Sequence, residues 1–155
     1  MPPAAEPLRE QLLAAVTARL AALTAGTTYW FTPAEATRDW KSWEETKAEA
    51  GKPGYGIIEG KEIQEDLTNT EVHVTHDVTV TGWIKEDQNR RTALNRAIAD
   101  IVKAIYTDET WGLPVTAAWT NVVEIVTDEA ALQSQGFAYF ELTARVHYDR
   151  ARTSV

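Results

Sequence analysis

Apolar and polar residues alternate through the middle of the chain, from Glu71 to Ile84. The apolar positions are Val72, Val74, Val78, Val80 and Ile84, and threonine, histidine or acidic residues fill most of the places between them. A period of two predicts a β-strand with one apolar face. Extended residues advance ~3.3 Å each, so this strand would span roughly 46 Å, whereas strands usually have about 5 to 6 residues. We therefore expect neighbouring copies of the chain, or another protein, to help cover it.

Two other segments repeat apolar residues at helical spacing. The first, within residues 7–25, carries Leu8, Leu12, Leu13, Val16, Leu20 and Leu23, and the second, within residues 88–106, carries Leu94, Ile98, Ile101, Val102 and Ile105. Side chains three or four positions apart share one face of a helix. The sequence therefore predicts two amphipathic helices.

Shorter apolar runs predict the remaining strands at residues 28–31, 55–64, 115–126 and 137–148. A polar loop at 127–136 would join the last two strands in an antiparallel hairpin. This order predicts an α+β fold, a mainly antiparallel β-sheet with two amphipathic helices packed on one face, in a single domain spanning residues 1–155. We expect flexible ends at residues 1–6 and 150–155.

Residues 32–54 give the weakest signal. Thr32-Pro33-Ala34-Glu35 has the form of a helix capping box, and residues 44–50 are good helix formers. Large apolar residues are few here, however. We expect a variable insertion or loop region, which could equally be an excursion that docks on another subunit.

Composition excludes several kinds of function. The 155 residues include no cysteine, so disulfides, thiol nucleophiles and thiolate metal sites are excluded. Lysine and arginine total 15 against 23 acidic residues, a formal net charge of −8 that disfavours binding to nucleic acid through a basic field. No basic region followed by an apolar run opens the chain, and no stretch approaches the ~20 apolar residues of a membrane span. We expect a soluble protein with no membrane partner.

Candidate chemistry is sparse. His73 and His76 are three apart in a strand and so lie on opposite faces, and His147 could approach either only by cross-strand pairing. Adjacent carboxylates fall in polar segments, and the only serines, Ser42, Ser134 and Ser154, form no nucleophile elbow. We expect no catalytic residue, no metal and no cofactor, and hence a protein that is not an enzyme.

Tryptophan is unusually frequent, with six residues. Trp83 falls on the threonine-rich face of the long strand, where an indole suits either a partner contact or a covered second face. Trp111 and Trp119 are expected in the core. The candidate contacts with subunits or partners are Trp40, Trp43 and Trp83, together with Asp128, Glu129 and Gln133 from the loop at 127–136.

Several segments carry a resemblance to a known family. They are residues 8–16 (LREQLLAAV), 29–33 (YWFTP), 76–83 (HDVTVTGW), 93–102 (ALNRAIADIV), 108–113 (DETWGL) and 140–149 (FELTARVHYD). Together, in this order, they resemble the tail terminator proteins of long-tailed bacteriophages, which close the tail tube. The match covers most of the chain as a pattern of ordinary strand and helix residues.

The resemblance implies a homohexameric ring in the virion, assembled in the bacterial host cytoplasm. Such a ring sits on the head-proximal end of the tail tube, stops polymerisation of the tube protein and joins the tail to the head connector or stopper protein. DNA would pass through its lumen without specific binding, which the acidic charge suits, since six copies carry 6 × −8 = −48.

Two alternatives stay open. One is a neighbouring neck or tail-completion protein of the same architecture. The other, of a different class, is a small α+β ligand-binding domain or enzyme with a pocket lined by Trp30, Tyr55 and His73 or similar groups.

Overall fold

The computed structural model describes residues 5–132 and 135–155, which form two helices and a five-stranded sheet. The helices are α1 (Leu8–Ala21) and α2 (Arg90–Thr107), and the strands are β1 (Glu35–Thr37), β2 (Gly54–Asp66), β3 (Glu71–Lys85), β4 (Thr116–Leu132) and β5 (Phe137–Ala151). The strand order is β1-β2-β3-β5-β4, with β1 parallel to β2 and every other pair antiparallel. The predicted α+β class is confirmed.

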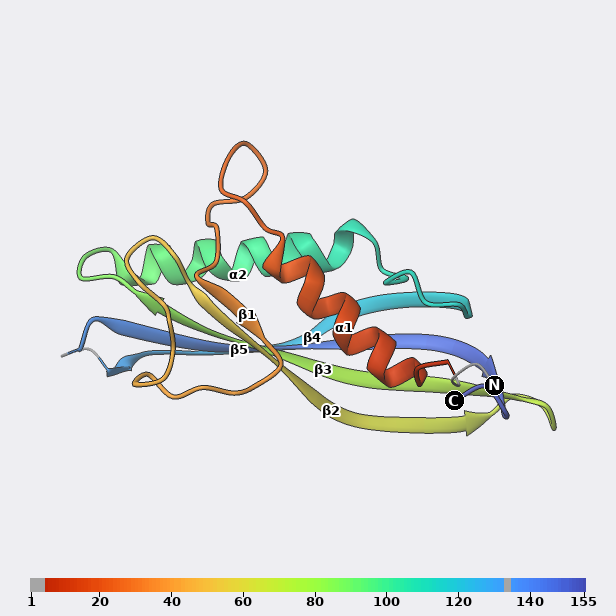
Figure 1. The fold of residues 1–155 in the computed structure, drawn as a ribbon. Helices are drawn as coiled ribbons and strands as arrows, with labels where there is room; N and C mark the ends of the chain where they lie inside the picture. The colour runs from red at the N-terminus through yellow and green to blue at the C-terminus, as the bar shows by residue number, and fades with distance from the viewer. Residues whose placement is uncertain (1–4, 133–134) are drawn as a thin grey trace.

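The long alternating strand lies at the centre of the sheet. β3 pairs with β5 along its full 15 residues, from Glu71 opposite Ala151 to Lys85 opposite Phe137. Its predicted apolar face is buried, and the alternate residues of β5 from Ala138 to Tyr148 are buried on the same side. Both helices cover that side, as Figure 1 shows. We call it the core face, and the opposite side the outer face.

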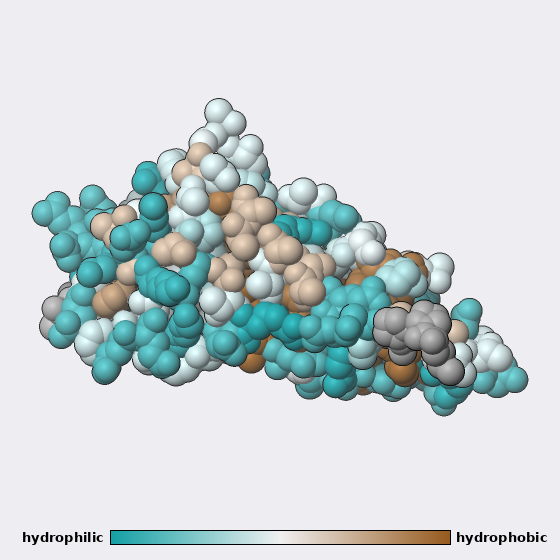
Figure 2. Space-filling model, in the orientation of Figure 1, coloured by the Kyte–Doolittle hydropathy of each residue, from teal (hydrophilic) through white to brown (hydrophobic). Residues whose placement is uncertain are grey.

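α1 buries the stripe that its spacing predicts, whereas α2 buries three residues of its predicted stripe and leaves Ile98 and Val102 partly buried. α1 buries Leu8, Leu12, Leu13, Val16 and Leu20, and α2 buries Leu94, Ile101 and Ile105 together with small alanines. The opposite side of α1 exposes alanines rather than charges, at Ala14, Ala18, Ala21 and Ala22, and Figure 2 shows them as a pale-brown stripe among hydrophilic residues. None of the described helices has the length and apolarity that a membrane crossing requires.

The strand predicted at residues 28–31 is wrong, and Asp100 is the reason. This carboxylate is 1% exposed on the buried side of α2. It accepts hydrogen bonds from the backbone N–H of Trp30 at 2.9 Å and of Phe31 at 3.0 Å. These donors are therefore satisfied by a side chain and not by a neighbouring strand.

Residues 32–54 form no helix. Glu35 lies in β1, opposite Gly54 of β2, and its carboxylate accepts from Lys41 Nζ at 2.8 Å and from the backbone N–H of Lys47 at 3.0 Å. The chain between β1 and β2 is a turn-rich excursion. Figure 1 shows it passing first below one end of the sheet and then rising past that end to the level of α2 before it enters β2.

The loop predicted at residues 127–136 is wrong as well, because β4 continues to Leu132. Thr127 pairs with Phe140, Asp128 with Tyr139 and Leu132 with Phe137. The register shifts between Asp128 and Leu132, so an irregular strand, and not a long loop, leads into β5. The antiparallel hairpin of the last two strands is confirmed.

The residues before α1 and after β5 meet at one end of the sheet. The backbone N–H of Leu8 donates to the backbone oxygen of Val155 at 2.9 Å, and the backbone N–H of Arg152 donates to the Thr70 carbonyl at 2.9 Å. Figure 1 shows α1 beginning beside the last residues of the chain.

His76 gives the fold a predicted pH dependence. The side chain is fully buried on the core face, and among the described residues neither ring nitrogen has a hydrogen-bond partner. Burial lowers its pKa, although the Glu62 and Glu59 carboxylates oppose the shift. Because the pKa of His76 is lower in the folded chain, the unfolded chain binds a proton at this histidine at a higher pH than the folded chain does. The free energy of unfolding therefore falls as the pH drops from about 6.5, the pKa of an unperturbed histidine, toward the pKa of His76 in the folded chain.

We expect His76→Leu to lose less stability than the wild type between pH 7.5 and 5.5. At pH 7.5 the free energy of unfolding of the variant should lie within about 1 kcal/mol of the wild type, because an unsatisfied polar group is replaced by an apolar one. Urea denaturation across that pH range measures both effects. Some pH dependence should remain in the variant, because burial also lowers the pKa of His147. Identical slopes for the two proteins would contradict the assignment to His76.

Candidate interaction surface

An aromatic cluster holds the excursion between β1 and β2 on the outer face. Trp83 packs against Tyr139 with ring centroids 4.6 Å apart and against Phe137 at 5.9 Å, and Trp43 approaches Phe137 at 6.2 Å. The Trp83 indole N–H donates to the Lys41 carbonyl at 2.7 Å. Trp83 is consequently only 9% exposed. Trp83 could have been either a partner contact or part of a covered second face of the sheet. The structure shows the second arrangement, so this side chain is not available as a surface contact.

Trp40 remains at the surface of this cluster. It is 51% exposed, and its indole N–H donates to the Tyr139 hydroxyl at 2.8 Å. That hydroxyl in turn donates to Glu141 at 2.8 Å, and burial followed by this hydrogen bond raises the pKa of Tyr139 to about 12. Trp40 is therefore an indole held in position, with half its surface open to a partner.

The register brings most of the candidate contacts together. Trp83, Tyr139 and Asp128 lie side by side in one row across β3, β5 and β4, and the segment from Trp40 to Trp43 covers the first two. Glu129 lies within β4, and Gln133 falls outside the described residues. Tryptophans and an acid that are far apart in sequence thus share one end of the outer face.

The exposed edge of β4 is a feature that the sequence did not predict. Among the described residues no strand pairs with the far side of β4, a strand of 17 residues. Among the side chains described in this strand, four large apolar ones are at least 40% exposed, namely Trp119, Val123, Ile125 and Val126. The apolar run from Val122 to Val126 suits a buried strand, and nothing in the sequence indicates that it lies at an edge. One backbone N–H of β4, that of Val122, donates to the hydroxyl of Tyr106 in α2 at 2.9 Å.

The opposite edge of the sheet has a different character. β1 covers only Gly54 to Gly56 of β2, and the remainder of β2 has an irregularity between Glu59 and Glu62 that contains Lys61. Bulges and charges, lysine above all, are the devices by which proteins keep sheet edges from pairing. The β4 edge carries bulges too, but it also carries exposed apolar side chains, so it is the edge better suited to a partner.

The centre of the outer face is polar. His73 Nδ1 lies 2.7 Å from an Asp149 carboxylate oxygen, and Arg145 makes a two-pronged contact with Asp77 at 2.8 and 3.2 Å. His147 lies between these pairs, bonded to Asn121 at 3.0 Å. Among the described residues, no group of three or more histidine, aspartate or glutamate side chains could hold a metal ion.

Trp119 also lies on this face, stacked on His147 with ring centroids 3.8 Å apart and an interplanar angle of 2°. It is 46% exposed, so its predicted place in the core is wrong. The register of β4 shifts between Thr116 and Trp119, which places Trp119 opposite His147, a residue of the outer face. Trp111 is buried, as predicted, and its indole donates to Thr120 at 2.9 Å.

Comparison with known proteins finds a likeness in fold only. No family model matches the chain, and no curated protein matches it. Among solved structures, the fold is similar to a chain described as "Virion of native gene transfer agent (GTA) particle", with a TM-score of 0.51 and 14% sequence identity. The match covers 94% of this chain and 100% of that chain. The two chains share one architecture from end to end.

The pocket expected for a ligand-binding domain does not assemble from the residues named for it. Tyr55 is 2% exposed on the core face, where its ring meets Phe140 edge-on at 6.3 Å. Trp30 is 57% exposed with the Arg96 guanidinium over its ring, and His73 lies on the outer face beside Asp149. These three side chains do not line a common cavity.

Proposed function

We propose that this protein is a structural component of a phage-type virion. The observation that carries the proposal is the end-to-end likeness in fold to a chain from a gene transfer agent virion, which spans that chain completely. The acidic net charge of −8 and the interaction surface described above are compatible with a protein that works by assembly.

Within that class we propose the tail terminator role, a homohexameric ring on the head-proximal end of the tail tube. The edges of the sheet support a ring, because the β4 edge is open whereas the β2 edge carries an irregularity and Lys61, which keep it from pairing. The β4 edge of one copy would therefore meet a different surface of the next copy. Such head-to-tail contacts form a ring where the rotation between copies closes.

The ring would then act by surface complementarity and not by chemistry. Its two open sides would meet the tube protein and the head connector or stopper protein, and DNA would pass through the lumen without specific binding. A neighbouring neck or tail-completion protein with the same fold is the alternative within this class. A small α+β ligand-binding domain or enzyme is the alternative from another class.

The test is the solution mass of the purified chain, by light scattering coupled to size exclusion, with negative-stain images of the peak. A species of six chains that forms rings and blocks the growth of tail-tube protein in vitro is the expected result. Rings that bind a connector but leave tube growth unchanged would favour the neck role. A monomer that neither assembles nor caps tubes at any concentration would contradict the proposal.

We expect replacement of Trp40 and Trp43 by alanine to reduce the capping of tail tubes at least tenfold at limiting protein. Trp40 is the half-exposed residue of the aromatic cluster, and exposed indoles are common anchors of interfaces. Trp30→Ala is the matched control, because that indole is equally exposed but lies near α2. Normal ring formation and normal capping by the double variant would remove these two residues from the interface.

A further inference from the structure

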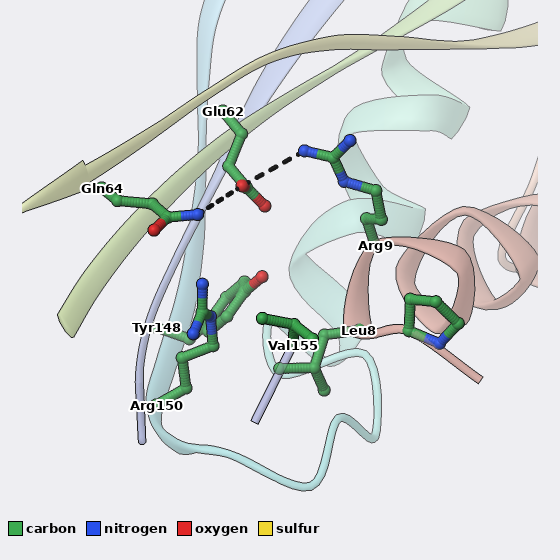
Figure 3. Close-up of a pocket in the computed structure, with 8 residues that line it drawn as sticks. Leu8, Arg9, Glu62, Gln64, Tyr148, Arg150 and Val155 are labelled. Carbon is green, nitrogen blue, oxygen red and sulfur yellow. Dashed lines mark hydrogen bonds and ion pairs between the residues drawn. The ribbon is translucent and has the colours of Figure 1, made fainter. Parts of the chain in front are cut away.

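A cavity of about 250 Å³ lies between the first turn of α1 and the adjoining parts of β2 and β5. Leu8 and Val155 form its apolar wall, and the other lining residues are mainly polar, as Figure 3 shows. A cavity of this size admits a ligand of a few non-hydrogen atoms. The polar groups that face it decide what kind of ligand that is.

Arg150 contributes a buried positive charge that has no acidic partner. The residue is 8% exposed, and one nitrogen, Nη1, donates to the backbone oxygens of Ala151 at 3.0 Å and Arg152 at 3.3 Å. No carboxylate of the described residues lies within ion-pair distance of its guanidinium. Arginine is always charged, and buried charges are almost always paired. The remaining donors of Arg150 are open to the cavity, where a bound anion would accept from them.

Tyr148 presents to the same cavity a second polar group that has no partner in the described part of the chain. Its side chain is 1% exposed, and the structure gives its hydroxyl no hydrogen-bond partner among the described residues. In Figure 3 the hydroxyl points toward the open centre of the cavity. Burial, and secondarily the charge of Glu62, raises the pKa of Tyr148, so the hydroxyl stays protonated and is available as a donor.

The acidic side chain of the cavity, Glu62, is already paired with Arg9, which it shares with Glu59 at 3.4 Å. Glu62 accepts from Gln64 at 2.8 Å and forms an ion pair with Arg9 at 3.2 Å, and these contacts keep its pKa low despite burial. It therefore does not serve Arg150.

We propose that this cavity binds a carboxylate carrying a short apolar group, with the Arg150 guanidinium and the Tyr148 hydroxyl as its donors. The carboxylate accepts from both groups, and the apolar part lies against Leu8 and Val155. Free small organic acids and the side chain of glutamate in a partner polypeptide present this chemistry alike. The site is separate from the β4 edge and the aromatic cluster, and it does not depend on the virion role.

The test is binding of n-butyrate, followed by isothermal titration and by saturation-transfer NMR on the intact chain. We expect a dissociation constant of about 1 mM for so small a ligand. Butyramide, which has the same shape without the charge, should bind at least tenfold more weakly. Acetyl-glutamate amide and acetyl-glutamine amide form the second pair of probes, and inorganic phosphate is the third.

Two variants identify the donors. Arg150→Gln should weaken butyrate binding at least tenfold, and Tyr148→Phe about three- to tenfold, with no loss of thermal stability in the latter because its hydroxyl is unpartnered. Arg145→Gln and Tyr106→Phe are matched controls that lie outside the cavity and should bind as the wild type does. If acetyl-glutamate amide binds more tightly than butyrate, the natural ligand is a glutamate side chain of a partner polypeptide. If butyrate binds more tightly, the natural ligand is a free organic acid.

Three results would overturn the proposal. They are binding of butyramide as tight as that of butyrate, undiminished butyrate binding by a folded Tyr148→Phe chain, and binding of phosphate but of neither carboxylate. Each of them removes the carboxylate or the donor on which the inference rests, and none bears on ring assembly.

Discussion

Replacing Gly82 by alanine will lower the free energy of unfolding by about 3 kcal/mol, which for a chain of this size lowers the melting temperature by about 6 to 12 °C. Gly82 lies on the core face of β3, directly opposite Phe140 of β5. A Cβ atom added there would overlap one edge of the Phe140 ring, 2.6 Å from Cζ and 2.8 Å from Cδ1. Phe140 is fully buried against Tyr55 and has no room to withdraw.

Gly26→Ala is the matched control for this change. A Cβ added at Gly26 meets no atom within 4 Å, so the same substitution should change stability by less than about 0.5 kcal/mol. Adding Phe140→Leu to Gly82→Ala should cost less than the two single changes together, because the smaller side chain relieves the overlap. Chemical denaturation at pH 7.5 measures all four variants. An unfolding free energy of Gly82→Ala equal to that of the wild type would show that the sheet can part at this point.

The elements that could be predicted from the sequence are those whose periodicity agrees with their tertiary environment. β3 alternates because one of its faces packs on two helices, and α1 and α2 repeat because each has one buried stripe. The segment at 28–31 has strand-forming residues, but its donors bind Asp100, which lies about 70 positions away in sequence. No local pattern encodes such a contact.

The interaction surface was only partly predictable, for a related reason. The high frequency of tryptophan indicated Trp40 and Trp43 as candidate contacts. Their position, however, depends on Tyr139 and Trp83, and hence on the register of β3 with β5. The exposed edge of β4 depends on strand order, because the same apolar run in a central strand would be buried. The cavity at Arg150 gave no signal, since an arginine at the end of a strand ordinarily points into solvent.

Replacing both Val123 and Val126 by lysine will prevent formation of the proposed ring while leaving the single chain folded. Both side chains are at least 40% exposed on the unpaired edge of β4, so neither lysine has to be buried in the single chain. In a head-to-tail ring every copy uses this edge, and two extra charges on each of six interfaces act together. Lysine on an edge strand is also the device by which natural proteins block pairing between sheets.

We expect the double variant to elute as a single chain of about 17.2 kDa at concentrations at which the wild type is assembled, with a melting temperature close to that of a wild-type monomer. The matched control is Leu67→Lys with Asn69→Lys, which adds the same charge to exposed positions in the turn between β2 and β3. That protein should assemble normally. Rings that persist in the Val123 and Val126 variant would mean that copies meet through another surface. The exposed alanines of α1 are then the next residues to substitute, because they form an apolar stripe on the surface of the folded chain.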